Sequence, residues 1–235
     1  MCGRFAQPRS ADELARIFHA RPVADLPGEQ FNVAPTDEVA GVVEQHGERL
    51  VDAFRWGLVP FFADSSNGAA RLINARAETV ETSPAFRDAF RRRRCILPAD
   101  AFYEWRREHD PTTGRTIRAR PFAIRRLDGE PLAFAGLWAI WRNPQTAERL
   151  YTCSIITTRA NELVGQLHDR MPVLLDAEDW DGWLAEGTAP DALRGLLHPS
   201  PAEPLDVYAV SPAVNNVRNE GPELLAPLSR WGRGL

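Results

Sequence analysis

The most informative absence from this 235-residue chain is lysine, because all 28 of its basic residues are arginine. The chain therefore has no side-chain amine that could attack a carbonyl group, as lysines do in Schiff-base chemistry. Residue 2 is a cysteine, and a small residue after Met1 is the usual condition for removal of the initiator methionine. Once Met1 is removed, the α-amino group of Cys2 is the one unhindered amine, with a pKa of about 7.7 to 8.0.

Other absences exclude whole classes of function. The sequence has no P-loop, GxGxxG, GxSxG or HExxH motif, so nucleotide hydrolysis, dinucleotide cofactors and zinc proteolysis lose their usual support. The cysteines, Cys2, Cys95 and Cys153, form no CxxC pair and no zinc-ligand spacing. We therefore expect no disulfide, no metal and no other cofactor.

Long hydrophobic runs are also missing. No stretch approaches the roughly 18 apolar residues of a membrane span, and the N-terminus is polar where a signal peptide would be apolar. We expect a cytoplasmic protein with no membrane contact.

Charge is distributed unevenly along the chain, although the net charge is only −4. Residues 71–126 contain 14 arginines against seven acidic residues, whereas residues 127–235 contain eight against 15. A local basic surface is what phosphate binding requires, so the first of these regions favours a nucleic-acid partner. The alternative is that Arg91–Arg94 form only the solvated end of a helix.

Capping signals predict several short helices. Ser10 and Glu13 form a capping box for a helix through Phe18. A second helix is expected to begin at Ser83-Pro84 and to run to about Arg93, because proline fits the first helical position. Two more are expected, one capped by Asp176 and ending at Leu184, the other over Pro190–Leu197.

Apolar runs bounded by turn residues predict a series of strands. The expected strands are Val39–Glu44, Leu50–Leu58, Cys95–Leu97, Ala101–Arg106, Phe122–Leu127, Leu132–Trp141, Tyr151–Thr157 and Asp206–Val210. Turn signals between several of them fit antiparallel neighbours. We expect an α+β fold, in one domain over residues 1–235, with a curved, mostly antiparallel and barrel-like sheet and flanking helices.

Cys2 carries two nucleophiles once its amine is free. The amine can form a Schiff base with an aldehyde, and the neighbouring thiol can then add to the imine carbon. The product is a five-membered thiazolidine ring, which persists far longer than the imine. The alternative is that Cys2 is incidental and that the missing lysine reflects an arginine-rich genome, so other residues must decide.

Asn74 and Arg76 are the first candidates for partners of Cys2. If residues 72–78 are extended, both side chains point to the same side. Neutral Asn74 could orient a nucleophile, and Arg76 could hold a phosphate. The alternative is a loop amide that satisfies backbone groups.

Glu104 and His168 are candidates for proton transfer. Glu104 lies in the aromatic run Phe102–Trp105, where desolvation would raise its pKa and suit it to deliver a proton. His168 lies in an apolar frame and can pass protons in both directions. The alternatives are a glutamate that faces outward or pairs with an arginine, and a structural histidine.

Several segments offer groups that could contact nucleic acid. The aromatic segment Trp56–Phe62 precedes a loop, where it could stack on unpaired bases or wedge a duplex end, although such clusters are more often core. Two polar segments suit phosphates. Their candidate contacts are Thr157, Asn161, Ser211 and Asn215.

Six motifs, in order along nearly the whole chain, closely resemble the SRAP family, the SOS response-associated peptidase domain. They are Met1–Phe5, Arg55–Pro60, Asn74–Arg76, Phe102–Trp105, Ala135–Trp138 and His168–Pro172. One departure is Ala101, which stands where glycine is expected and adds a methyl group near the glutamate strand.

The resemblance implies a monomeric DNA-repair protein that binds single-stranded DNA, captures abasic sites covalently and joins the nucleoid on damage. It places the nucleophile at Cys2, the orienting asparagine at Asn74, the acid at Glu104 and the histidine at His168. It also places phosphate contacts and an aromatic wall at Arg4, Arg76, Arg170 and Trp56.

The expected function is that of an abasic-site sensor that forms a thiazolidine cross-link through Cys2, with lyase-type activity and an (auto)peptidase activity; whether the protein removes its own Met1 stays open. Two alternatives stay open. One is a hydrolase in which Cys2 is an N-terminal nucleophile, which would turn over a peptide without DNA. The other is a non-covalent single-strand binder, whose complex would be salt-sensitive and would not survive denaturation.

Overall fold

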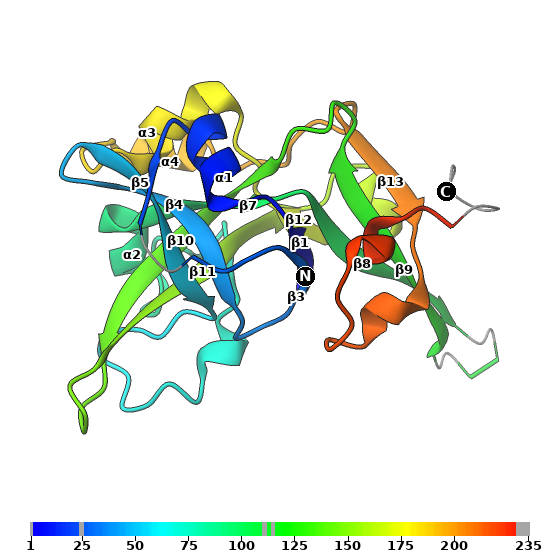
Figure 1. The fold of residues 1–235 in the computed structure, drawn as a ribbon, viewed down its shortest axis with the longest axis horizontal. Coiled ribbons are helices and arrows are strands. Elements are labelled where there is room, and N and C mark those ends of the chain that lie inside the picture. The colour runs from blue at the N-terminus through cyan, green and yellow to red at the C-terminus, as the bar shows by residue number, and fades with distance from the viewer. Residues whose placement is uncertain (1, 24–25, 110–111, 114–115, 229–235) are drawn as a thin grey trace.

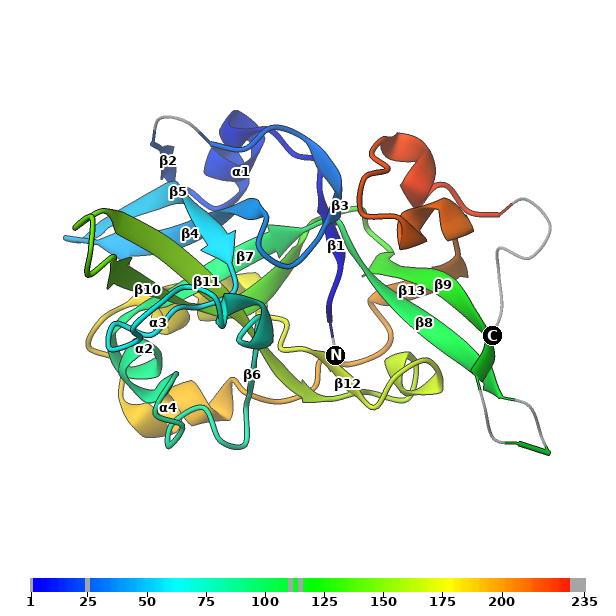
Figure 2. The same cartoon turned by 90° about the horizontal axis from the view of Figure 1, so that it is seen from below.

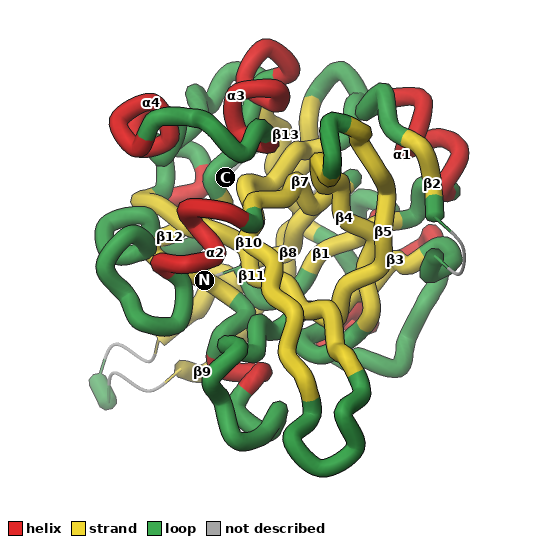
Figure 3. Tube along the Cα trace, turned by 90° about the vertical axis from the view of Figure 1, so that its left-hand side faces the viewer, coloured by secondary structure: helices red, strands yellow, loops and turns green. Residues whose placement is uncertain are grey.

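The computed structural model describes residues 2–23, 26–109, 112–113 and 116–228. Its larger sheet has the strand order β12-β11-β10-β7-β4-β5-β2. Five of these strands close into a barrel, because β5 also pairs with β11 in parallel, while the other neighbours in the ring are antiparallel. Figure 3 shows this ring of strands with the helices outside it. The ring strands are β4 (Glu38–Gln45), β5 (Glu48–Trp56), β7 (Arg94–Ala99), β10 (Leu132–Arg142) and β11 (Arg149–Arg159).

Three short strands extend the barrel sheet. The first, β2 (Arg21–Pro22), pairs with β5, whereas β6 (Asn74–Arg76) and β12 (Arg170–Pro172) both pair with β11. The two strands beside β11 carry residues predicted to act in the site, so the edge of the barrel at β11 positions them.

A second sheet has the order β13-β9-β8-β1-β3. Its strands are β1 (Phe5–Gln7), β3 (Gln30–Val33), β8 (Ala101–His109), β9 (Thr116–Arg126) and β13 (Leu205–Ala209). Figures 1 and 2 show β1 between the barrel and the strands β8, β9 and β13 of this sheet. The residues just before β1 therefore lie where the two sheets meet.

Gln7 ties β1 to the barrel. Its side chain is buried; Nε2 donates to the carbonyls of Ala40 and Pro98 at 2.9 and 2.8 Å, and Oε1 accepts from the Ala40 amide at 2.7 Å. Buried polar groups are satisfied by such bonds, and losing one partner leaves the others with the full desolvation penalty. The strand that carries the N-terminus is thus fixed to both sheets.

The core is apolar and rich in aromatic rings. Phe5 packs edge-on against Trp56 and Phe134, with ring centroids 5.0 and 5.9 Å apart, and Phe134 also contacts Phe102. All four side chains are essentially buried. Edge-on pairs of this kind add to the free energy gained from burial alone.

Helices cover the outside of the barrel, and most follow the sequence signals. The α-helices are α1 (Ala11–Ile17), α2 (Arg87–Arg92), α3 (Trp180–Leu184) and α4 (Pro190–Gly195). Short 3₁₀ helices lie at η1 (Ala69–Arg71), η2 (Val164–Gln166), η3 (Ala177–Asp179), η4 (Pro212–Asn215) and η5 (Pro222–Leu225). The capping box predicted for Ser10 and Glu13 is present at the start of α1. In the described part of the chain, no helix has the length and apolar character needed to cross a membrane.

Two helix starts differ from the prediction. The second helix begins at Arg87 rather than at Ser83-Pro84, because residues 84–86 form turns before it. Asp176 makes no side-chain cap bond, and the segment after it is a 3₁₀ turn that becomes α3 only at Trp180. The predicted strands and the α+β class, with its curved and mostly antiparallel sheet, are confirmed.

Candidate active site

Cys2 lies just ahead of β1 and its side chain is fully buried. Burial raises the pKa of the Cys2 thiol well above its ordinary value, and the negative charge of Glu104 raises it further. The thiol is therefore neutral near pH 7. It is placed for a reaction inside the protein rather than for attack on a group in bulk solvent.

Asn74 holds the backbone of Cys2. The asparagine begins β6, which pairs with β11 through Ile155, and its Nδ2 donates to the Cys2 carbonyl at 2.8 Å. In the same strand Ala75 is buried, whereas Arg76 is exposed, so Asn74 and Arg76 share the side opposite Ala75, as the sequence predicts. Within the described residues, the buried Oδ1 of Asn74 has no hydrogen-bond partner. It is an acceptor aimed into the site.

Glu104 points inward from β8. Only 4% of the residue is exposed, and it faces Phe122 of β9 across the ladder. Burial raises its pKa to about 7. The desolvation predicted from its aromatic neighbours is therefore present, and about half of the carboxyl groups hold a proton near neutral pH.

His168 lies between η2 and β12, with about a third of its side chain exposed. Its Nδ1 is 3.0 Å from the backbone amide of Arg170 and 2.8 Å from a carboxylate oxygen of Asp169. Burial lowers the pKa of His168. In the neutral ring Nδ1 accepts from the Arg170 amide, and protonation turns the same atom into a donor to Asp169. The residue has a partner for each protonation state.

Arg4 is half-buried and anchored by a buried amide. One of its nitrogens donates to Asn32 Oδ1 at 2.7 Å and to the Val214 carbonyl at 2.9 Å. Asn32 also donates to the carbonyls of Asn216 and Asn219 at 3.0 and 2.9 Å. It thereby fixes both Arg4 and the segment after β13. The sequence offered no sign of this role for Asn32.

Two predicted DNA contacts lie in that same segment. Ser211 caps η4 by accepting from the Ala213 amide, and exposed Asn215 accepts from the Trp105 ring nitrogen at 2.7 Å. Asn215 thus stays at the surface beside the site, whereas the Ser211 hydroxyl shapes the backbone there.

Arg170 forms a two-pronged ion pair with Glu78 at 2.5 and 2.9 Å and also donates to the Thr157 carbonyl at 2.5 Å. The pair lowers the pKa of Glu78. Arg76 has no hydrogen-bond or ion-pair partner within the described residues. One of the two predicted phosphate contacts on this side is therefore preorganised, and the other carries an unpaired charge.

Three predicted DNA contacts are buried. Trp56 is 0% exposed and donates to the Ile73 carbonyl, and Thr157 is likewise 0% exposed. Asn161 caps the Val164 amide with Oδ1. These residues support their neighbours from inside the protein, and their side chains are not at its surface. The exposed aromatics of the predicted segment are instead Phe61 and Phe62, at 62% and 56%.

Part of the predicted basic surface is also internal. Arg94 is 3% exposed and donates to the carbonyls of Phe90 and Trp183, as well as to that of Ala185. It ties α2 to α3 and is not available to phosphates. The sequence did not predict this burial of Arg94, which begins β7, whereas Arg91 and Arg92 are exposed at the end of α2, as expected for a solvated helix end.

Two neighbouring hollows lie beside Cys2. The first has a volume of about 440 Å³ and the second about 630 Å³. Arg107 and His168 line both, so the hollows are adjacent. The first is lined by Gly3, Arg4, Glu104, Trp105 and Asn215, and the second by Arg76, Arg159, Asp169 and Arg170. The part of the chain that the structure describes holds no cluster of three or more His, Cys, Asp or Glu side chains that could bind a metal ion.

The geometry thus joins a buried cysteine, an amide, a proton-holding carboxyl and a histidine beside an arginine-lined surface. A family model described as SOS response associated peptidase (SRAP) matches residues 1–217. The chain therefore belongs to the SRAP family.

Known proteins of this kind resemble the chain over nearly its full length. It is 40% identical to the abasic site processing protein YoqW of Bacillus subtilis (strain 168) over 230 residues, which cover 96% of this chain and 99% of YoqW. It is 30% identical to the abasic site processing protein YedK of Escherichia coli (strain K12) over 236 residues, covering 97% and 100%. A crystal structure of a protein from Bacteroides thetaiotaomicron matches with a TM-score of 0.84 and 25% identity, covering 97% of this chain and 100% of that one.

Proposed function

We propose that this protein captures abasic sites in single-stranded DNA by forming a thiazolidine between Cys2 and the damaged sugar. The observation that carries the proposal is the meeting of four groups from distant parts of the sequence. Cys2, Asn74, Glu104 and His168 come from the N-terminus, β6, β8 and the segment before β12, and gather where the two sheets meet. The relatives named abasic site processing proteins support the same substrate.

Met1 must be removed before the reaction, because it acylates the nitrogen of Cys2. The freed amine then attacks the aldehyde carbon C1′ of the ring-opened sugar. A C–N bond forms, and the aldehyde oxygen leaves as water to give an imine. The thiol adds across the C=N bond, so that sulfur bonds to C1′ and the thiol proton passes to nitrogen. The overall reaction releases one water molecule.

The neighbouring residues have distinct parts in this proposal. Glu104, protonated in about half of the molecules near pH 7, gives a proton to the ring oxygen of the closed sugar and so favours the aldehyde. The Asn74 amide fixes the Cys2 carbonyl, and its unoccupied Oδ1 can accept from the freed amine. His168 exchanges protons during loss of water.

The DNA backbone is held by arginines and its bases by aromatic rings. Arg4, Arg76 and Arg170 supply phosphate contacts around the hollows. The exposed rings of Phe61 and Phe62 are suited to stacking on unpaired bases.

The test mixes untagged protein with a single-stranded oligonucleotide that contains one abasic site, followed by denaturation and intact-mass measurement. The expected product has the mass of protein without Met1 plus DNA minus one water. Cys2→Ala, an N-terminally blocked protein and an undamaged oligonucleotide should give no such species. An unchanged yield from the blocked protein would refute the proposal.

The same reaction mixture distinguishes covalent capture from strand cleavage, peptidase activity and passive DNA binding. Cys2→Ser keeps the amine but closes the oxygen analogue of the ring much less favourably, so strand cleavage through the imine is expected in place of a stable adduct. A peptidase would turn over peptide without DNA. A passive binder would leave no species after denaturation.

A further inference from the structure

Three arginines beside the site make no close ion pair within the described residues, although Arg76 and Arg107 act at longer range on Glu78 and Glu104. Arg76, Arg107 and Arg159 line the second hollow, and within the described residues none of them has a hydrogen bond or ion pair from its side chain. They come from β6, β8 and the end of β11. Like charges held together repel, and an anion that passes over all three relieves that repulsion.

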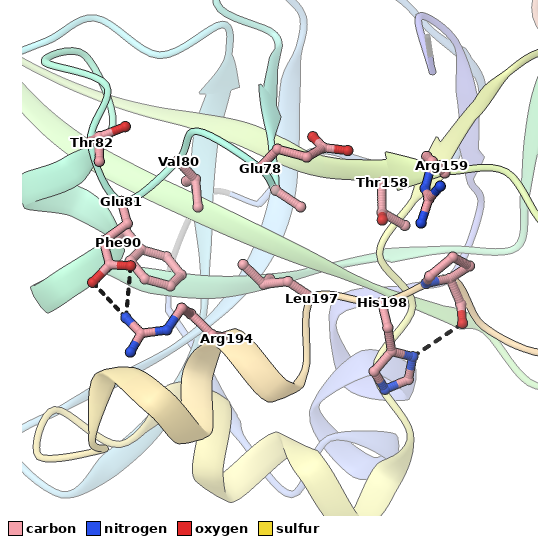
Figure 4. Close-up of a pocket in the computed structure, with 12 residues that line it drawn as sticks. Glu78, Val80, Glu81, Thr82, Phe90, Thr158, Arg159, Arg194, Leu197 and His198 are labelled. Carbon is pink, nitrogen blue, oxygen red and sulfur yellow. Dashed lines mark hydrogen bonds and ion pairs between the residues drawn. The ribbon is translucent and has the colours of Figure 1, made fainter.

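Arg159 also lines a third cavity, of about 450 Å³. Figure 4 shows this cavity between the loop after β6 and the segment around α4, with Arg159 separated from Arg194 by Val80 and Leu197. Because Arg159 lines the second hollow as well, the third cavity lies next to that hollow.

The inside of the third cavity combines an apolar floor with a polar edge. Val80, Phe90 and Leu197 supply carbon surface, whereas Thr82 and His198 supply groups that can donate or accept hydrogen bonds. A cavity of this size falls within the range that holds small organic ligands. A flat ring with polar edges fits such a lining.

Each acidic residue of the cavity is paired with an arginine. Glu78 contacts Arg170 at 2.5 and 2.9 Å, and Glu81 contacts Arg194 at 2.8 Å, although Arg194 also pairs with Asp191. The charge left without a partner is that of Arg159, which is exposed at the entrance. Among the described residues that line this cavity, Arg159 is thus the cation whose side chain makes no ion pair, and it lies beside apolar side chains.

We propose that the third cavity is a nucleotide subsite, which takes an unpaired base that flanks the abasic site while Arg159 holds the phosphate leading to it. This inference rests on the proposed function for the strand that passes the site. The three neighbouring hollows would let the strand pass over Arg107, Arg76 and Arg159. Phosphate contacts position the strand and the apolar floor receives the base.

The test measures non-covalent binding of undamaged single-stranded oligonucleotides, trimmed one nucleotide at a time from either end. Wild-type protein should lose affinity in one distinct step as trimming on one side removes the base that fills the cavity. Arg159→Ala should weaken binding several-fold and reduce the slope of log affinity against log salt by about 0.7, the value for one phosphate contact.

Two further variants distinguish a base-binding subsite from a general electrostatic attraction between the DNA and the protein surface. Thr82→Trp places a ring over the cavity from an exposed position, so it should abolish the length step without changing the salt slope. Arg92→Ala removes an exposed arginine of α2 that lines none of the three cavities, and it should leave both the step and the slope unchanged.

The subsite is refuted if trimming gives no distinct step, or if Arg92→Ala weakens binding as much as Arg159→Ala. Covalent capture is measured separately in wild-type protein, from the mass of the adduct that it forms with an abasic oligonucleotide. A cross-link without a length step rejects the subsite alone. A length step without a cross-link rejects the covalent chemistry alone.

Discussion

Replacing Glu104 with glutamine should change how the stability of the protein depends on pH. The carboxyl group has a pKa of about 7 in the folded chain against an ordinary value of 4.5, because burial penalises its charged form. Below about pH 4.5 it is protonated in both the folded and the unfolded states. Between the two values only the unfolded state loses its proton, so the free energy of unfolding falls by about 1.4 kcal/mol per pH unit.

The size of the effect follows from the shift. A difference of about 2.5 pKa units corresponds to about 3 kcal/mol, which is fully lost above pH 7. Glutamine stays neutral and has nearly the same shape, so the variant lacks this loss. Arg107 and Asp169, which lower and raise the pKa of Glu104, remain in both proteins. Between about pH 5 and 8, Glu104→Gln should gain about 2.5 kcal/mol relative to wild type.

The assay is equilibrium denaturation of both proteins across this pH range. Glu178→Gln removes an exposed carboxyl group from η3, and its difference from wild type should not vary with pH in this way. If the difference between Glu104→Gln and wild type is also constant, the carboxyl group is ionised at neutral pH. Glu104 would then hold no proton to deliver to the sugar at neutral pH.

Three other changes have outcomes that the structure specifies. Asn74→Ala removes the bond to the Cys2 carbonyl and should slow adduct formation about tenfold or more, measured by timed quenching on denaturing gels; an unchanged rate would exclude a positioning role. Gly57→Ala should lower the free energy of unfolding by about 2 kcal/mol or more in denaturant titrations, because Gly57 has a φ of +126° and the added carbon would lie 2.7 Å from the Ala69 carbonyl oxygen. Gln7→Leu should cost about 2 to 4 kcal/mol in the same assay, since it strands buried backbone groups, and a loss under 1 kcal/mol would show that those groups find other partners.

The strands were the most predictable part of the fold. Apolar alternation and turn residues locate β4, β5, β7, β8, β10 and β11, and the His46-Gly47 turn joins the first two with positive φ at both positions. A barrel-like sheet was expected, but the strand pairing that closes the barrel could not be predicted. It depends on Arg55 and Trp56 pairing with Thr152 and Cys153, nearly a hundred residues later, and no local pattern encodes that register.

The residues of the candidate site likewise differ in whether the sequence could identify them. Glu104 could be identified because its aromatic neighbours stand beside it in the sequence, and desolvation follows from them. Asn32 could not, because its role is to hold Arg4 and a segment that lies more than 180 residues away. Trp56 shows the opposite difficulty: an aromatic motif has the same appearance whether its ring faces a ligand or the core.

The anchoring of β1 has a mechanical consequence. If DNA is joined at Cys2, tension on the DNA reaches β1 directly, and the bonds of Gln7 to Ala40 and Pro98 share that load with the ladders to β3 and β8. Yielding then requires many bonds to break together, at the slow rate of forced unfolding. An enzyme that translocates along the DNA would therefore meet a rigid obstacle at the cross-link. The linked protein would resist unfolding longer than one joined through an unstructured N-terminal segment of the same length.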